Sequence, residues 1–180
     1  MKQPLLFAAL LGFCLQAFAQ KLNLEEQKLY NLMMVYRKSL GLQDIPISPN
    51  LNKVAQMHAR DLAENYRFGT ECNMHSWSSK GRWKAVCYTA DHAQKELMWS
   101  KPAELSAYKA FGFEIAHGGP EGYVATAEKA LEGWKGSPGH NALIAGKAPW
   151  DKTQWKAIGI GIYKGFAIVW FGMEADNPVQ

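Results

Sequence analysis

The C-terminal part of the chain alternates with a period of two, and this pattern constrains the fold more than any other feature of the sequence. Isoleucine recurs at positions 158, 160 and 162, Lys164-Gly165 has the composition of a tight turn, and large apolar residues recur at 166, 168 and 170. Alternation on both sides of a two-residue turn is typical of a β-hairpin. We therefore predict that the chain contains an antiparallel hairpin here.

The N-terminal part follows the helical period instead. Asn23 followed by Glu26 is the pattern of a capping box, apolar residues then recur three and four positions apart, and Gly41 ends the pattern. The dipeptide Ser48-Pro49 gives a second start signal, with serine as N-cap and proline at the first helical position. Two helices are therefore expected before position 69, and the second should run to about residue 67.

The middle of the chain is less regular. Residues 69–105 are aromatic and polar without a clear period, so we expect a long loop. Helical spacing returns from Val124 to Trp134, and Ser137-Pro138 repeats the start signal for a short helix that carries His140. Helices that precede strands indicate an α+β fold, with helices packed on an antiparallel sheet.

The first 19 residues have the composition of a secretory signal. Lys2 precedes an apolar run over 5–14, and Ala-Phe-Ala at 17–19 supplies a cleavage site before Gln20. This run is too short to span a membrane, and no later segment has the roughly 20 consecutive apolar residues that a transmembrane helix needs. We expect residues 1–19 to be cleaved and residues 20–180 to form one secreted or periplasmic domain. A lipoprotein acylated at Cys14 is the alternative.

Two cysteines remain once Cys14 leaves with the signal. Cys72 and Cys87 form an even pair in a chain bound for an oxidising compartment, which favours a disulfide. Closing a loop of this size stabilises a fold by roughly 3 kcal/mol in the chain-entropy model. Two free or metal-binding thiols are the alternative.

The charge distribution argues against one class of partner. The formal net charge is +4 at pH 7, and acidic and basic residues are interspersed along the chain. Nucleic-acid binding usually requires a concentrated basic stripe. We therefore expect no nucleic-acid partner.

Several short landmarks follow one another in a fixed order along the chain. They are Tyr36-Arg37 before Gly41-Leu42, His58-Ala59, His75-Ser76, Phe111-Gly112-Phe113-Glu114, Trp134, Ser137-Pro138-Gly139-His140 and the strand that begins near Trp155. Each is short, but their order and spacing together are specific. The chain resembles the CAP family of cysteine-rich secretory, antigen 5 and pathogenesis-related proteins. The segment that contains the helix tryptophan and the second cleft histidine is most similar to the compact bacterial branch of SCP-like extracellular proteins.

The resemblance implies a fold and a site. Proteins of the family fold as an α-β-α sandwich with an antiparallel sheet between helices, and their central cleft carries two histidines and two glutamates. His75, Glu114 and His140 correspond to three of these four residues. The position of the fourth falls on Gly136-Ser137, so one of the family's glutamates is missing.

The three cleft residues suggest two kinds of chemistry. His75, His140 and Glu114 can together hold Zn²⁺ or another divalent cation with an open position for water, and the metal would lower the pKa of that water. Glu114 could instead act as a base beside the metal. One carboxylate cannot fill both roles, and Glu128 and Glu132 do not fall at the family position. A weak metal or ligand site without turnover and a purely structural polar cluster remain as alternatives.

The other histidines have plainer interpretations. His58 falls in the apolar stripe of the second helix and is expected to be a core histidine, while His92 is expected to be a solvated loop residue. His117 follows Glu114 by three residues, which on a helix would make a ligand pair. The glycines and proline that follow exclude a helix there, so we place His117 at the cleft rim or in a turn.

The tryptophans divide into two groups. Those at 134, 155 and 170 fall at periodic positions and are expected in the core. Trp77, Trp83 and Trp99 fall in the predicted loop, where they either pack that loop or line a cleft. We place Trp77 and its neighbour Ser76 at the cleft rim. No nucleophile motif surrounds Ser76, so a catalytic serine is not expected.

The main hypothesis is a secreted CAP-domain binding or interaction protein with a cleft around His75, Glu114 and His140. The cleft would hold a divalent cation or a small ligand such as a lipid or sterol, a glycan or a peptide, and a protein partner is also open. No organic cofactor is expected. The alternatives are a metal-dependent hydrolase, with Glu114 as the candidate catalytic residue, and a structural cell-envelope protein with an inert cleft. The missing glutamate favours binding, and the fold alone does not select a function.

Overall fold

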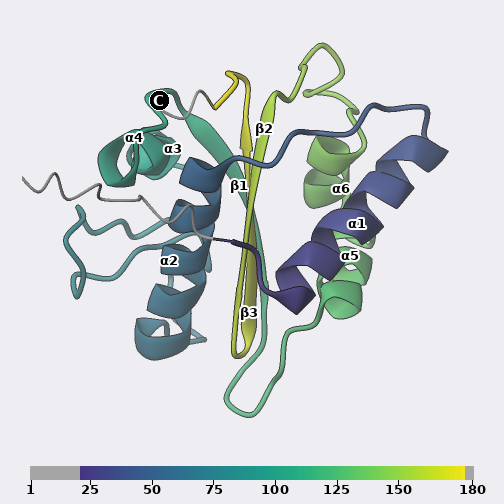
Figure 1. Cartoon of the computed structure of the whole chain (residues 1–180). Coiled ribbons are helices and arrows are strands. Elements are labelled where there is room, and N and C mark those ends of the chain that lie inside the picture. Colours follow the sequence, from purple (N-terminus) through teal and green to yellow (C-terminus); the bar gives the residue numbers. More distant parts are fainter. Residues whose placement is uncertain (1–20, 177–180) are drawn as a thin grey trace, which may run out of the picture.

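An antiparallel sheet lies between two layers of helices in the computed structural model, which describes residues 21–176 (Figure 1). One face is covered by α1 (Leu24–Ser39), α5 (Ala127–Lys135) and α6 (Pro138–Ile144). The other is covered by α2 (Pro49–Asn65), α3 (Lys95–Trp99) and α4 (Lys101–Leu105). This arrangement confirms the expected α-β-α sandwich. The predicted signal at residues 1–19 and the alternative at Cys14 lie outside the described residues.

The sheet has three strands in the order β1-β3-β2, and both pairings are antiparallel. The predicted hairpin is confirmed as β2 (Ala157–Tyr163) and β3 (Phe166–Gly172). The third strand, β1 (Gly112–Gly118), pairs with the other side of β3. The sequence predicts no strand here, because its apolar and polar residues do not alternate strictly.

The predicted helix starts are confirmed at α1 and α2. The side-chain oxygen of Asn23 accepts a hydrogen bond from the Glu26 amide, and the Glu26 carboxylate accepts one from the Asn23 amide, which completes the capping box. Ser48 caps α2 by accepting a hydrogen bond from the Leu51 amide at 2.9 Å. The third expected helix starts later than predicted, because Thr126 is the N-cap and the preceding valine is exposed.

The start of α2 is also held from the far end of the described chain. The Asp176 carboxylate accepts hydrogen bonds from the Ser48 hydroxyl and from the Asn50 amide, the latter at 3.1 Å. Its second oxygen accepts one from the Asn50 side chain at 2.8 Å. A carboxylate at a helix N-terminus also interacts favourably with the helix dipole. Residues that are 128 positions apart in sequence therefore share one cap.

The backbone of α2 packs directly on β2. A Cβ added to Gly159 would lie 2.1 Å from the carbonyl carbon of Leu51, and one added to Gly161 would lie 2.3 Å from that of Ala55. Separate apolar clusters fill the two faces of the sheet. The tryptophans at 134, 155 and 170 are buried in these clusters, as predicted.

The outer edge of β2 is closed by hydrogen bonds from outside the sheet. Every second amide of the strand has a partner there: Ile158 donates to the Pro46 carbonyl at 2.9 Å, Ile160 to the Asn52 side chain at 3.0 Å, and Ile162 to the Glu26 carboxylate at 3.0 Å. Asn52 and Glu26 are both buried. The edge is therefore unable to pair with another strand.

The predicted loop over 69–105 is only partly irregular, because α3 and α4 lie within it. Proline at the second position of α4 suits a helix start, where an amide has no helical partner. None of the helices within residues 21–176 is long and apolar enough to cross a membrane.

Candidate functional site

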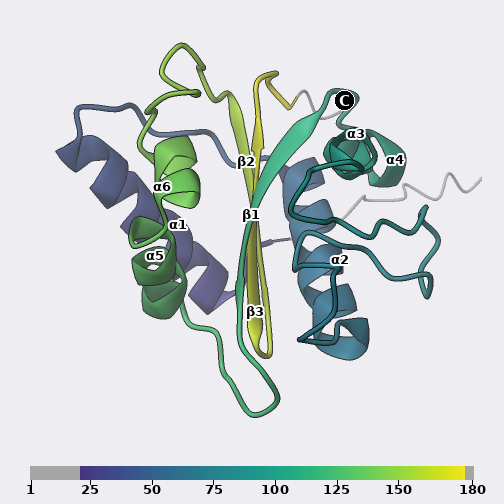
Figure 2. The same ribbon diagram turned by 180° about the vertical axis from the view of Figure 1, so that it is seen from behind.

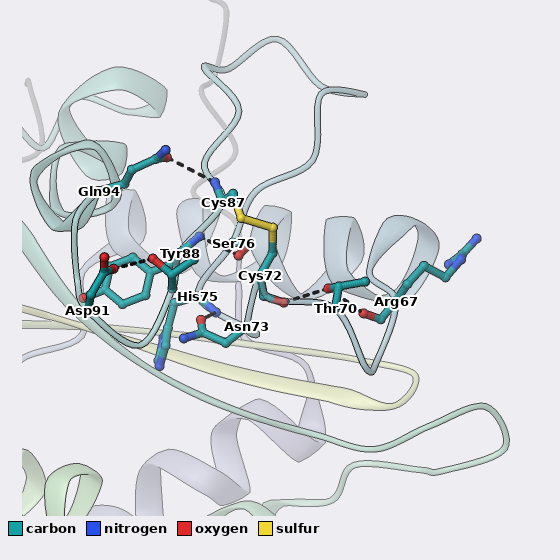
Figure 3. Close-up of a disulfide and its surroundings, with 11 residues drawn as sticks. Arg67, Thr70, Cys72, Asn73, His75, Ser76, Cys87, Tyr88, Asp91 and Gln94 are labelled. Carbon is teal, nitrogen blue, oxygen red and sulfur yellow. Dashed lines mark hydrogen bonds between the residues drawn. A yellow bond between two sulfur atoms is a disulfide. The ribbon is translucent and has the colours of Figure 1, made fainter.

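A disulfide fixes the loop that carries His75 (Figure 3). Cys72 and Cys87 are bonded with their Cα atoms 4.8 Å apart, which confirms the predicted pairing. Beside the disulfide, the Asn73 amide donates to the Tyr88 carbonyl at 2.8 Å. The loop that positions His75 is therefore closed both covalently and by backbone hydrogen bonds.

The side chain of His75 is oriented by Glu114. Nδ1 of His75 lies 2.6 Å from Oε2 of Glu114, which projects from β1 toward the α2 face of the sheet. The Glu114 side chain is completely buried, whereas one fifth of the His75 side chain is exposed. A short, charge-assisted hydrogen bond of this kind fixes the ring and leaves Nε2 as the nitrogen free for a ligand.

A second imidazole completes this buried cluster. Nε2 of His58, on α2, lies 2.9 Å from the Ser76 carbonyl and must donate to it. Nδ1 then lies 3.5 Å from Oε1 of Glu114, and neither of these two atoms has a hydrogen-bond partner within the described part of the chain. His58 thus holds the loop backbone next to His75 and lies against the carboxylate that orients the His75 ring.

The sequence predicts the burial of His58 but not its contact with Glu114. The ring is fully buried and stacks on Trp77 with a centroid separation of 4.2 Å, as a core histidine does. A buried imidazole needs hydrogen-bond partners, so the predicted burial of His58 already implies polar groups beside it. The identity of the partner depends on β1, which the sequence did not predict as a strand.

His140 reaches the same place from the opposite face of the sheet. It projects from the first turn of α6, and its ring centroid lies 6.0 Å from that of His75. The structure therefore brings together the three residues that the family resemblance selects: His75 and Glu114 in direct contact, and His140 across from them.

Burial and charge shift the pKa values of these imidazoles in opposite directions. Burial lowers the pKa of His75, but the charge of Glu114 and the hydrogen bond to it outweigh burial, so the net shift is upward. Burial and the nearby His75 lower the pKa of His140. Burial also lowers the pKa of His58. Of the pair at the cleft, His75 therefore holds its second proton to a higher pH than His140 does.

A cavity of about 450 Å³ opens above these residues. Its polar lining consists of His75, His92, Lys95, Glu114 and His140. The rest is mainly aromatic and aliphatic: Tyr88, Met98, Trp99, Phe113, Ile115, Leu143 and Trp150, with Gly139 at the edge of α6. Apolar walls with a few polar groups are typical of small-ligand sites.

The residues predicted at the rim do not line this cavity. Trp77 is only 2% exposed and lies in the core on the α2 face, so its placement at the rim is corrected. The Ser76 hydroxyl accepts a hydrogen bond from the Tyr88 amide at 2.8 Å and helps to close the loop. The tryptophans of the predicted loop therefore lie in different places. Trp83 packs edge-on against Trp77, whereas Trp99 lines the cavity.

His117 lies on β1 rather than in a turn. Residues three apart on a strand point to opposite faces, so His117 is turned away from Glu114. Its Nε2 lies 2.8 Å from the Tyr123 hydroxyl, and its ring packs beside Trp134. His117 therefore supports the contact between β1 and α5.

The two other glutamates considered for the site lie on the surface of α5. Glu128 pairs with Lys28, and Glu132 pairs with Lys135 at 2.9 Å. Both side chains are more than half exposed. Neither contributes to the cavity, so Glu114 is its only carboxylate among the residues that the structure describes.

The donor atoms of the cleft fit a divalent cation only in part. Within residues 21–176, the set of three potential ligands that lies within 4.8 Å is Glu71, Cys72 and Cys87, and both of its thiols are in the disulfide. His75, Glu114 and His140 do not form such a set: the first two are in direct contact, so it is His140 that lies too far from them. The arrangement suits two imidazole ligands with Glu114 supporting one of them from behind.

The sandwich, the disulfide-closed loop and the paired cleft histidines together define a CAP-type domain. The sequence pattern of the cysteine-rich secretory protein family, CAP, matches residues 30–166, and the chain belongs to this family. No curated protein matches the sequence.

Solved structures show the same fold. An outer surface protein from Borrelia burgdorferi superimposes with a TM-score of 0.54 at 19% identity, over 82% of this chain and 91% of the other. An extracellular protein containing a SCP domain from Bacillus anthracis gives 0.53 at 18%, over 82% of this chain. A cysteine-rich secretory protein from Staphylococcus aureus gives 0.51 at 14%, over 83%. The chain spans 39% and 38% of these last two proteins.

Proposed function

We propose that this chain is a secreted or periplasmic binding protein whose cleft takes an amphipathic ligand. The observation that carries the proposal is the cavity of about 450 Å³, in which apolar walls surround the His75 and His140 pair. The walls would bury the apolar part of the ligand, and the imidazoles would bind its polar group. Export is supported by the signal pattern in the sequence and by membership of a secretory family.

The arrangement of the carboxylate favours binding over hydrolysis. Glu114 accepts a hydrogen bond from His75 and its side chain is completely buried, so it does not reach water in the cavity. The position of the family's second glutamate is occupied by Gly136-Ser137. We therefore give Glu114 a positioning role rather than a catalytic one.

Fluorescence of anilinonaphthalene sulfonate tests the proposal, because this probe combines aromatic rings with an anionic group and its emission can be excited through Trp99 and Trp150. Gly139 offers a matched pair of variants, since a Cβ added there meets nothing within 4 Å. We expect Gly139→Trp to fill the cleft and weaken probe binding at least about tenfold, a loss of about 1.4 kcal/mol, while Gly139→Ala binds as the native chain does.

Circular dichroism should first show that both variants fold. Equal binding by the native chain and Gly139→Trp would place the probe elsewhere and would contradict the proposal. The alanine variant should also be more stable by about 0.5 to 1 kcal/mol, because it replaces glycine inside a helix.

A divalent cation is the second candidate ligand, favoured by the 6.0 Å separation of the two cleft imidazoles. His75, through Nε2, and His140 would hold it, and Glu114 would keep the His75 ring in position. A zinc ion bound in this way would supply Lewis acidity to a group bound beside it.

Calorimetric titration of Zn²⁺ into the metal-free chain tests this candidate. Saturable binding at one site, lost in a His75→Ala and His140→Ala double variant, is the expected result. Identical flat traces for both proteins would remove zinc as a ligand and leave the amphipathic ligand as the remaining candidate.

A further inference from the structure

We propose that the ligand of the cleft is an extended peptide segment that pairs with the outer edge of β1 and carries a carboxylate. The inference rests on the proposed function, because it assigns a chemical class to the ligand of the same cavity.

The sheet register places the main chain of Glu114 on the outer side of β1. On β2, Ile158, Ile160 and Ile162 direct their amides away from β3, so Gly159 and Gly161 between them face β3. The partners of β2 on β3 are then Trp170 and Ile168, and the alternate residue Val169 faces β1. Ile115 is the residue paired with Val169, so its neighbour Glu114 turns its N–H and C=O outward.

A hydrogen bond further along β1 supports this assignment. Trp134 Nε1 donates to the Ala116 carbonyl at 3.1 Å, and Ala116 lies two residues after Glu114 and therefore on the same outer edge. The second half of the edge is thus covered by α5. Figure 2 shows β1 at the near side of the sheet, with α5 and α6 to one side of it and α3 and α4 to the other. The first half of its outer edge, which includes Glu114, faces the cavity.

The exposure of Glu114 shows which of its atoms a ligand can reach. The residue as a whole is 6% exposed, but its side chain is 0% exposed, so the accessible atoms are those of the main chain. Phe113, Glu114 and Ile115 all line the cavity although consecutive side chains on a strand point to opposite faces. A cavity that touches all three must run along the strand edge.

A main-chain donor and acceptor on one residue match the pairing of an extended peptide. In an antiparallel pair, one residue of the added strand can donate to the Glu114 carbonyl and accept from its amide. Its neighbouring side chains would then lie toward the aromatic residues at the two walls, Trp99 of α3 and Trp150 beyond α6. Strand addition of this kind obtains affinity from main-chain hydrogen bonds and specificity from side-chain pockets.

The remaining polar lining favours an acidic peptide. Lys95 brings a positive charge to the cavity, and His75 and His140 present ring nitrogens. The single carboxylate, Glu114, is buried behind His75 and is compensated by it. A side-chain or C-terminal carboxylate on the peptide is therefore complementary to the site.

A phage-displayed library of short random peptides tests the inference. It would be panned against the native chain and counter-selected on Gly139→Trp, whose cleft is filled. We expect enrichment of peptides that contain an acidic residue between apolar ones. Changing that acid to its amide, or Lys95→Gln in the protein, should weaken binding about three- to tenfold.

N-methylation of a selected peptide then distinguishes strand pairing from other modes. Alternate amides of a paired strand face the partner, so methylation at one set of alternate positions should weaken binding at least about tenfold, while the other set should be tolerated. Equal effects at both sets would overturn pairing with β1. Absence of cleft-dependent peptides, with anilinonaphthalene sulfonate still bound, would overturn the peptide but not the proposed function. If neither peptides nor anilinonaphthalene sulfonate bound in the cleft, both the peptide ligand and the proposed function would be overturned.

Discussion

The two edge strands of the sheet, β2 and β1, differ in what their outer main-chain groups face. Along β2, alternate amides donate to Pro46, Asn52 and Glu26, and two buried polar side chains are committed to closing that edge. Along the first half of β1, the main chain of Glu114 opens into a cavity lined with aromatic residues. The same sheet thus has one edge closed by the core and one edge available to a ligand.

This difference separates stability from function in the molecule. The closed edge uses groups that are costly to leave unpaired, so substitutions there should act on folding. The open edge is held in place from behind, by the disulfide and by the cluster of His58, Glu114 and His75. Substitutions there should act on ligand binding and on the local ionisation of imidazoles.

The largest expected effect is at the closed edge, where α2 rests on the glycines of β2. Gly161→Val should lower the free energy of unfolding by about 4 kcal/mol or more, because even a Cβ at this position would lie 2.3 Å from the Ala55 backbone. Urea denaturation would measure the loss. A native-like midpoint would show that α2 can move away from β2 at little cost. Gly136→Ala, with no contact closer than 3.5 Å, is the control.

Glu26→Ala should be the next most damaging change. The carboxylate accepts hydrogen bonds from the Asn23 amide, the Gln56 side chain and the Ile162 amide, and the residue is 1% exposed. Removing it leaves buried donors unpaired, so we expect a loss of about 3 kcal/mol in the free energy of unfolding. The neighbouring exposed substitution Gln27→Ala should change this free energy by less than about 0.5 kcal/mol. Similar losses of unfolding free energy in Glu26→Ala and Gln27→Ala would contradict the role of Glu26 in closing the edge of β2.

Removal of the disulfide tests how the loop beside the open edge of β1 is held in place. The Cys72→Ala, Cys87→Ala double variant should lose about 2 to 3 kcal/mol, given the sequence separation of 15 residues. Loss of affinity for anilinonaphthalene sulfonate should accompany it, because the loop carries His75. A variant that is destabilised but binds the probe with native affinity would show that backbone hydrogen bonds alone hold the loop.

The smallest expected effect concerns pH. The pKa of His75 lies above its ordinary value of 6.5 because Glu114 outweighs burial, so its contribution to stability is fully present below pH 6.5 and is lost as pH rises through the folded-state pKa. In Glu114→Gln, burial is no longer opposed, and the pKa of His75 should fall. Titration of the imidazole by NMR would measure this shift. The exposed variant Glu96→Gln should leave the imidazole titration unchanged, and a shift there would indicate a long-range charge effect instead.

Much of the architecture could be predicted from local patterns. The capping box at Asn23, the Ser48-Pro49 start and the alternation of β2 and β3 are short-range signals, and each produced the expected element. β1 was missed because its residues face both an apolar core and a buried polar cluster, which removes the simple alternation. Without β1, the strand edge that faces the cavity could not be located from the sequence.

The site was predicted in outline through family resemblance. His75, Glu114 and His140 come together, yet the cavity walls come from Trp99, Trp150 and other residues of segments far apart in sequence. No local period links such segments, because their proximity depends on how the helices pack against the sheet. The same limit explains why Trp77 was assigned to the rim instead of the core.

The carboxylate of Asp176 has a consequence for the order of events during synthesis. It completes the cap of α2 from a position 128 residues after Ser48, so the helix that contains His58 leaves the ribosome long before its final hydrogen bonds are available. Contacts of such long range form late and are slow to nucleate. A nascent chain that stops short of residue 176 should therefore hold α2 more loosely than the finished protein does.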